Sequence, residues 1–244
     1  MRAFLPACAV ALALAVAPAA MADTGKQTPG APCTPGGGVG TGNPCTGNNG
    51  NPSPEGNTEK VTKDNHPPAF TIARPPGAGA FISQVGDRDA TTVSQKRNTQ
   101  YARIDQSGDG NSASVAQSDN GAHYASAAQT GSFNELALAQ SGAAVQIALI
   151  EQRGNFDKMS LTQQGGAVSS AVAASQLGSS DTMSLTQSGD NNQARLVQNG
   201  SGDAMSATQT GGNNQLTWTQ NGNNLSDLAI SQTGGRALAV TQSR

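Results

Sequence analysis

Aromatic and charged side chains are both scarce in this sequence. Aromatic residues make up 3% and charged residues 12% of its 244 positions, and the formal net charge is −2 at pH 7. A nucleic-acid-binding protein usually carries a clustered excess of lysine and arginine. The composition therefore argues against a nucleic-acid partner.

Residues that commonly perform catalysis or bind metals are also few. The chain has two histidines, of which His66 lies in a non-periodic segment and His123 in a predicted turn, and neither is placed beside a nucleophile. Turn aspartates such as Asp87 and Asp190 could coordinate calcium, but repeats that do so follow the denser nonapeptide pattern. We predict no catalytic residue, cofactor or metal, and hence no enzyme.

Long apolar runs are absent except near the N-terminus. Residues 1–22 have the form of a secretory signal, with Arg2 before the apolar run Ala9–Ala17 and a small-residue cleavage site at Ala20–Ala22. The run is too short to span a bilayer, and no later stretch is longer. We therefore predict an exported chain whose mature form has no membrane span.

Residues 23–79 show no periodicity and hold most of the prolines, together with many Gly, Asn and Thr residues. Such a composition cannot bury enough apolar surface to offset the chain entropy lost on folding, so we predict that this segment is disordered. Cys33 and Cys45 lie within it, and in an exported protein they could form a disulfide or remain free thiols.

Residues 80–244 contain a short repeat marked by glutamine. A glutamine recurs every 10 to 13 residues throughout this segment. These glutamines are Gln84, Gln95, Gln106, Gln117, Gln129, Gln140, Gln152, Gln163, Gln176, Gln187, Gln198, Gln209, Gln220, Gln232 and Gln242. A period of this kind is typical of a solenoid.

The residues before each glutamine alternate between apolar and polar. Positions two and four before it are apolar except at Thr91, as Leu185 and Met183 are before Gln187. The positions between are mostly small or polar, as Ser184 and Thr186 are. Alternation with period two indicates a strand with two apolar side chains and the glutamine on one face.

A turn follows each glutamine. Glycine stands two positions later in twelve of the fifteen units, and Asn, Asp or another Gly comes after it, which suits backbone with positive φ. The predicted turn residues are Gly86, Gly108, Asn111, Gly131, Asn134, Gly142, Gly154, Gly165, Gly178, Gly189, Asn192, Gly200, Gly211, Asn214, Gly222 and Gly234. Two strands and two turns make one coil, so we predict an all-β, two-sheet parallel β-solenoid, or β-helix.

An inward glutamine needs hydrogen-bond partners, because an unpaired buried amide costs about 1–3 kcal/mol. Coils stacked at about 4.8 Å place identical side chains where each amide can donate to one neighbour and accept from the other. We therefore predict a glutamine ladder in each sheet.

The unit Gln-x-Gly-x-x-Asn, as in Gln106–Asn111 and Gln187–Asn192, resembles the curlin repeat of bacterial curli subunits. The resemblance covers residues 80–244. The units that depart from it carry an aspartate in place of the Asn at Asp89, Asp157, Asp181 and Asp203, and Lys96 and Arg97 in place of the glycine step.

The resemblance implies a structural subunit of secreted, extracellular amyloid fibres that support adhesion and biofilm matrix. The implied partners are further copies of the chain, a second curlin-repeat subunit, periplasmic chaperones and an outer-membrane export channel, for which residues 23–79 would be the recognition segment. The last repeat, Leu238–Gln242, keeps the inward pattern, and we expect no cap over either end of the solenoid. Uncapped ends favour polymerisation.

Two alternatives remain open. Ser160 and Thr162, with their equivalents in later units, would stack into hydroxyl rows, so the solenoid could be a soluble monomeric module that binds ice or a surface glycan. The chain could also be a minor nucleating subunit of the fibre rather than the major one.

Overall fold

The computed structural model describes residues 60–64 and 77–244, which belong to one compact unit of the chain. All of the regular structure in these residues is β-strand. The predicted signal 1–22, Cys33, Cys45 and most of the segment 23–79 lie outside the described residues.

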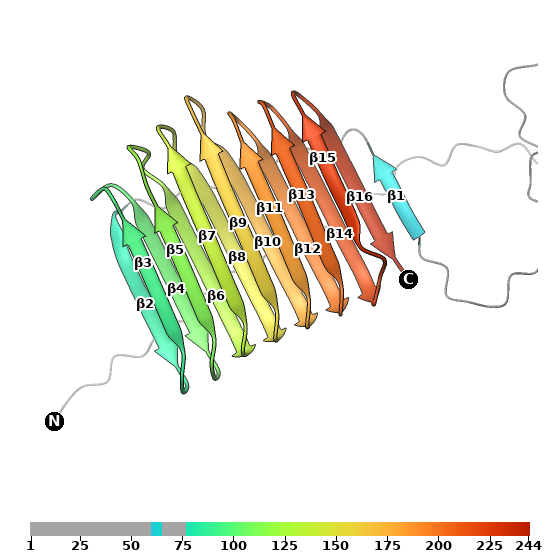
Figure 1. Cartoon of the computed structure of the whole chain (residues 1–244), viewed down its shortest axis with the longest axis horizontal. Coiled ribbons are helices and arrows are strands. Elements are labelled where there is room, and N and C mark those ends of the chain that lie inside the picture. Colours follow the sequence, from blue (N-terminus) through green and yellow to red (C-terminus); the bar gives the residue numbers. More distant parts are fainter. Residues whose placement is uncertain (1–59, 65–76) are drawn as a thin grey trace, which may run out of the picture. The chain divides into compact units, whose positions relative to one another are not determined.

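The strands of the described residues form two sheets (Figure 1). Sheet A has nine strands, in the spatial order β1 (Lys60–Asp64), β16 (Ala237–Ser243), β14 (Gln215–Asn223), β12 (Gln193–Ser201), β10 (Ser170–Ser179), β8 (Gln146–Asn155), β6 (Tyr124–Ser132), β4 (Tyr101–Ser107) and β2 (Gly79–Val85). Sheet B has seven, in the order β15 (Leu228–Thr233), β13 (Ala204–Thr210), β11 (Thr182–Ser188), β9 (Lys158–Gly165), β7 (Glu135–Gly142), β5 (Ser112–Gln117) and β3 (Ala90–Gln95).

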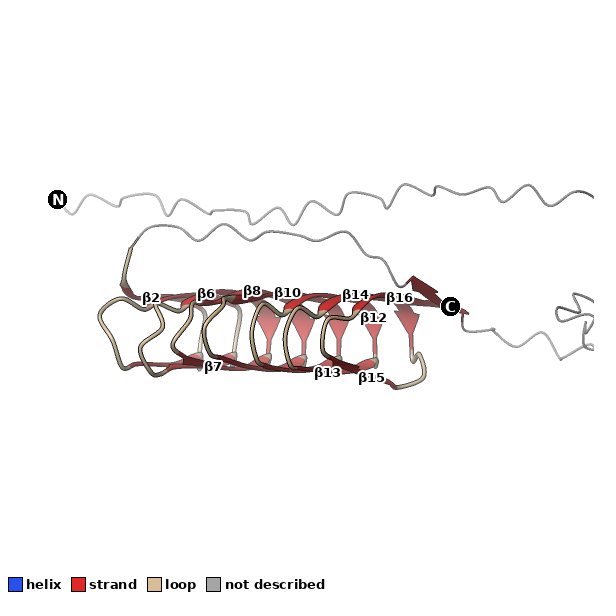
Figure 2. Ribbon diagram, turned by 90° about the horizontal axis from the view of Figure 1, so that it is seen from above, coloured by secondary structure: helices blue, strands red, loops and turns tan. Residues whose placement is uncertain are grey.

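From β2 onward the chain alternates between the two sheets, and every strand pairs in parallel with the strand one coil away. Figure 2 shows the sheets as two layers joined by the turns. The register is set by the repeat, because Gln187 of β11 lies beside Gln163 of β9 and Gln209 of β13. The predicted two-sheet parallel β-solenoid is confirmed.

The core lies between the two sheets and consists of the residues that the alternation predicts. From Gln106 to Gln220, each residue two or four positions before a ladder glutamine is buried. Trp218 is the largest of these fully buried side chains. A shift of one residue in any strand would turn this set outward, so burial of one face specifies the register.

Glycine is required in the turns that leave sheet A because successive turns stack backbone against backbone. Gly154 has φ of 149°, and a Cβ atom there would overlap the carbonyl oxygen of Gly178 in the next coil. The same overlap occurs along the column at Gly131 and Gly200. Of the predicted turn glycines, Gly165 alone lacks a positive φ; a Cβ atom at this position would overlap the Gln146 amide.

One strand lies where we expected no regular structure. β1 pairs antiparallel with β16, with Val61 opposite Gln242, and so covers the outer edge of sheet A beside the last repeat. The expectation of an uncovered edge at this position was wrong. The unpaired N–H and C=O groups of an edge strand can pair with any extended segment, and Val61-Thr62 is a β-branched pair that favours extended backbone.

Within residues 60–64 and 77–244 there is no helix of the length and apolar character needed to cross a membrane.

Candidate functional site: the polar columns of the solenoid

The glutamine ladder runs through the interior of both sheets. In each sheet, Nε2 of one glutamine donates to Oε1 of the glutamine one coil further along, at 2.7–3.0 Å. From Gln106 onward these side chains are buried. All the donors point toward the C-terminal coil, so the amide dipoles are aligned and the two ends of the ladder are chemically different.

The second hydrogen of each amide ties one sheet to the other. Gln140 of sheet B donates to the carbonyl oxygen of Tyr124 at the start of β6 in sheet A (3.1 Å), as well as to Gln163 (2.9 Å). Gln152 of sheet A makes the corresponding bond to Glu135 at the start of β7 (3.2 Å). The ladder therefore satisfies its buried amides and fixes the two sheets relative to each other.

Among residues 60–64 and 77–244, nothing covers the inward residues of the first coil, which is formed by β2 and β3. Ile82 is 49% exposed, whereas Ile104, which occupies the same position one coil later, is 0% exposed. Gln84 is likewise exposed, although its Nε2 donates to Gln106 at 2.7 Å. The coil carries the inward pattern except at Thr91, and it forms one edge of each sheet.

A second polar column lies in the turns that lead from sheet A to sheet B. We call it the Asx column: Asp89, Asn111, Asn134, Asp157, Asp181 and Asp203, each six positions before a ladder glutamine. In each of these turns, Oδ1 of one member accepts the backbone N–H of the residue that follows it in the column, at 2.7–3.1 Å. The column ends at Leu225, whose N–H donates to Asp203.

The second polar atom of the side chain, Nδ2 in the asparagines and Oδ2 in the aspartates, behaves differently in the two residue types. Nδ2 of Asn111 donates to the carbonyl oxygen of Gly131, and Nδ2 of Asn134 to that of Gly154, both at 2.9 Å. Oδ2 of Asp157 and Oδ2 of Asp181 are buried without a hydrogen-bond partner. Burial raises the pKa of Asp157 to about 6 and that of Asp181 to about 7, and the carboxyls of Asp157 and Asp203 add to the shift at Asp181.

The opposite turns hold a third column, which is less regular. Its members also stand six positions before a ladder glutamine: Gln100, His123, Gln146, Ser170, Asn192 and Asn214. His123, Asn192 and Asn214 were predicted to lie in turns; counting back six positions from the glutamines would also have found the other three. Every one of them is buried.

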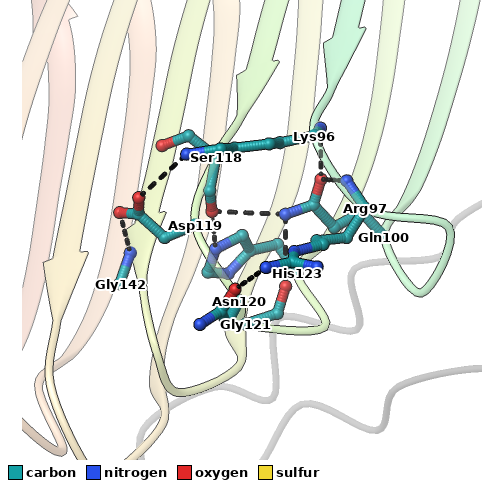
Figure 3. Close-up of polar contacts among 9 residues, drawn as sticks. All are labelled: Lys96, Arg97, Gln100, Ser118, Asp119, Asn120, Gly121, His123 and Gly142. Atoms are coloured by element: carbon teal, nitrogen blue, oxygen red, sulfur yellow. Dashed lines mark hydrogen bonds and ion pairs between the residues drawn. The ribbon is translucent and has the colours of Figure 1, made fainter.

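Where Lys96 and Arg97 replace the glycine step, side chains complete the turn (Figure 3). Oε1 of Gln100 accepts the backbone N–H groups of Lys96 and Arg97 at 2.9 and 3.1 Å, and its Nε2 donates to Ser118 and Gly121 carbonyls at 3.2 Å. Gln100 thereby replaces the hydrogen bonds that a glycine turn would make with its neighbours.

Ion pairs and side-chain hydrogen bonds add to this turn at the surface. Lys96 Nζ lies 3.9 Å from the Asp119 carboxylate, and Arg97 donates to Asn120. Asp119 Oδ2 also accepts the Gly142 N–H of the following coil at 3.0 Å. Exposed pairs of this kind contribute little, about 0–1 kcal/mol each.

His123 was predicted to lie in a turn, and it does, but it is fully buried there. Its Nδ1 accepts the backbone N–H of Gln146 (3.2 Å), so Nε2 carries the proton and donates to the Ser118 carbonyl (2.8 Å). Like the Gln100 amide, the imidazole therefore bonds to backbone groups of the turns.

The predicted hydroxyl rows lie on the outer face of sheet B. Pairing aligns Ser160 with Ser184 and Ser206, and Thr162 with Thr186 and Thr208. Beyond these three coils the rows meet Ala137 and Ala139 on one side and Ala229 on the other.

No group of three or more His, Cys, Asp or Glu side chains within residues 60–64 and 77–244 could hold a metal ion. No protein-family model, curated protein or solved structure matches this chain.

Proposed function

We propose that this chain is a structural subunit of secreted, curli-like amyloid fibres in which copies stack end to end. The exposed inward face of the first coil carries the proposal, because Ile82 is 49% exposed where its equivalent one coil later is fully buried. The resemblance of the repeat to the curlin unit and the two glutamine ladders support the same function.

A second copy whose β1 has been displaced from β16 could stack its β16 and β15 on this coil, which would repeat the contacts that already exist inside the chain. The edge N–H and C=O groups of β2 and β3 would pair, and the ladders of Gln84 and Gln95 would extend by one member. Burying the exposed half of Ile82 contributes about 1 kcal/mol in addition. Each of these terms recurs at every coil, so the energy that holds a coil in the solenoid would also hold one molecule on the next.

The cellular setting follows from the resemblance. Export would proceed through an outer-membrane channel that recognises residues 23–79, with periplasmic chaperones keeping the chain unassembled, and a second curlin-repeat subunit would anchor or nucleate the fibre. The fibre would lie outside the cell and support adhesion and biofilm matrix.

Seeded polymerisation of the purified mature protein tests this function. We expect β-rich fibres that bind thioflavin T after a lag, and we expect preformed fibres to abolish the lag. Ile82→Asp should prevent growth on the first coil by placing a charge in the contact, whereas Ser83→Asp, directed to the outer face, serves as the matched control. A mature protein that stays monomeric by light scattering at micromolar concentration for days would contradict the proposal.

Such an outcome would favour the soluble binding module, for which the aligned hydroxyls of β9, β11 and β13 are the supporting observation. Inhibition of ice recrystallisation, lost on changing Thr186 to Leu, would identify that function. Fibre growth by a second curlin-repeat protein that begins only when this chain is added would identify the nucleating role instead.

A further inference from the structure

Three of the aspartates that replace the curlin asparagine stand on consecutive coils of the Asx column. Asp157 and Asp181 are 0% exposed and Asp203 is 2% exposed. In each, Oδ1 is held by the backbone N–H of the next coil, at 3.1, 3.0 and 2.7 Å. That bond fixes the carboxyl plane, so the position of Oδ2 is also fixed.

Oδ2 occupies the place that the asparagine nitrogen takes elsewhere in the column. In coils with asparagine, this atom donates to a glycine carbonyl of the next coil, as Asn134 does to Gly154. A Cβ atom built on Gly154 would lie 2.9 Å from Oδ2 of Asp157 and would overlap the carbonyl oxygen of Gly178, so the two oxygens lie on the same side of Gly154. Gly178 stands in the same relation to Asp181 and to the Gly200 carbonyl.

An ionised carboxylate is unsuited to this position. Both of its oxygens accept only, so Oδ2 would face a carbonyl oxygen with no hydrogen between them. A protonated carboxyl has the shape of the asparagine amide and can donate its O–H as the amide donates N–H. Because the site is buried, the charged form would also lose its hydration, and the backbone N–H at Oδ1 replaces only part of it.

Among the described groups beside the Asx column, no cationic side chain offsets the negative charge that the ionised aspartates would carry. The cationic side chains that flank Asp157 in the sequence point to other partners: Arg153 Nε pairs with Glu151 at 2.5 Å and Lys158 Nζ with Glu135 at 3.3 Å. The charged groups that act on Asp181 are the neighbouring carboxyls of Asp157 and Asp203, which disfavour its ionisation further.

We propose that the Asx column takes up protons from solvent when the solenoid folds, so that folding and stacking of this chain are favoured by mild acid and weakened at neutral and alkaline pH. Asp157 and Asp181 are the groups that respond. The part of this inference that concerns fibres rests on the proposed function, whereas the part that concerns folding does not.

The direction and the pH range of this effect on folding follow from the raised pKa values of Asp157 and Asp181. Burial raises the pKa of both carboxyls in the folded chain above the ordinary value of 3.8, to about 6 for Asp157 and about 7 for Asp181. A carboxyl whose pKa is raised in the folded chain stabilises the fold fully at pH values below its unfolded-state pKa. This stabilisation is lost as the pH rises through the folded-state pKa. The ratio of folded to unfolded chains should therefore fall between about pH 4 and about pH 7, by about tenfold per pH unit for each proton released on unfolding.

The matched variant is Asp157→Asn with Asp181→Asn, which copies Asn111 and Asn134 of the same column. Wild-type protein should unfold at lower denaturant and extend seeds more slowly at about pH 7.5 than at about pH 4.5, and the double variant should lose this difference. The control, Asp109→Asn with Asp227→Asn, removes two charges from exposed positions and should keep the difference between the two pH values. Asn134→Asp should enlarge that difference.

Infrared spectroscopy of the folded protein gives an independent reading. The carbonyl band of protonated carboxyls should persist in the wild type above the pH at which exposed aspartates ionise, and should be weaker there in the double asparagine variant. Equal pH dependence in the two proteins, or no such band in the wild type, would overturn the inference. If no fibres form at any pH, the proposed function fails, while the unfolding and infrared measurements still decide whether the column takes up protons.

Discussion

A single ladder glutamine joins three coils and both sheets. Gln140 accepts from Gln117, donates to Gln163 and donates to the carbonyl of Tyr124 in the other sheet. Its removal leaves three buried polar groups without their partner, and each unsatisfied group costs about 1–3 kcal/mol. The ladder thus contributes to register as well as to stability, because a glutamine out of line would lose all three bonds.

We predict that Gln140→Ala lowers the free energy of unfolding by about 3 kcal/mol or more and slows seeded fibre growth. Ala139→Ser, one position away on the outer face, should change the free energy of unfolding by less than about 0.5 kcal/mol and should change the rate of seeded growth correspondingly little. Denaturant titration and thioflavin kinetics on the two variants provide the measurements. Similar effects at the two positions would show that the ladder hydrogen bonds of Gln140 do not account for its contribution to stability and fibre growth.

Each strand and turn could be predicted from the sequence where the chemistry is local and repeated. The alternation before Leu161 or Leu185 identifies a strand, and the following glycine identifies a turn, without knowledge of any neighbour. The hydrogen-bond partners of His123 and Gln100 could not be predicted in this way, because those partners lie in turns of adjacent coils. The protonated state suggested for Asp157 likewise depends on the carbonyl that stacking brings to it.

Gly154→Ala should be among the most destabilising single changes in a turn. The left-handed region costs an alanine about 1–2 kcal/mol, and overlap with the Gly178 backbone adds about 1–3 kcal/mol because neither coil can move without breaking its ladders. Gly234→Ala is the control, since its φ is 59° but its Cβ would meet nothing within 4 Å, and it should cost about 1 kcal/mol. Denaturation midpoints that are equal for the two would argue against tight stacking of the turns.

At the scale of the whole molecule, the two ends of the described solenoid differ. At the first coil, β2 and β3 are the outermost strands of their sheets, whereas at the other end the outermost strands are β15 and β1, which lies on β16. The sequence did not indicate this asymmetry, because the five residues of β1 are too short to predict a strand and pair only with an edge far away in the chain. A copy that adds at β16 would first have to displace β1.

We therefore predict that replacing residues 60–64 by a Gly-Ser segment of equal length shortens the lag of fibre formation and raises the rate of growth, because it frees the edge of β16. A variant in which only Lys60 and Lys63 become serine keeps an extended segment and should behave more like the wild type. Thioflavin kinetics at matched concentrations distinguish the two. A slower or unchanged lag in the Gly-Ser variant would mean that β1 does not hinder assembly.

The in-register pairing of equivalent strands has a genetic consequence. Strand β10 pairs with β8 and with β12 through the same positions, so each coil meets its neighbours through nearly the same surface on both sides. A deletion of residues 182–203 would bring β10 against β14 with glutamine still beside glutamine and glycine still beside glycine. Duplication or loss of one coil-length stretch of coding sequence would then lengthen or shorten the protein by a whole coil while the fold stays the same.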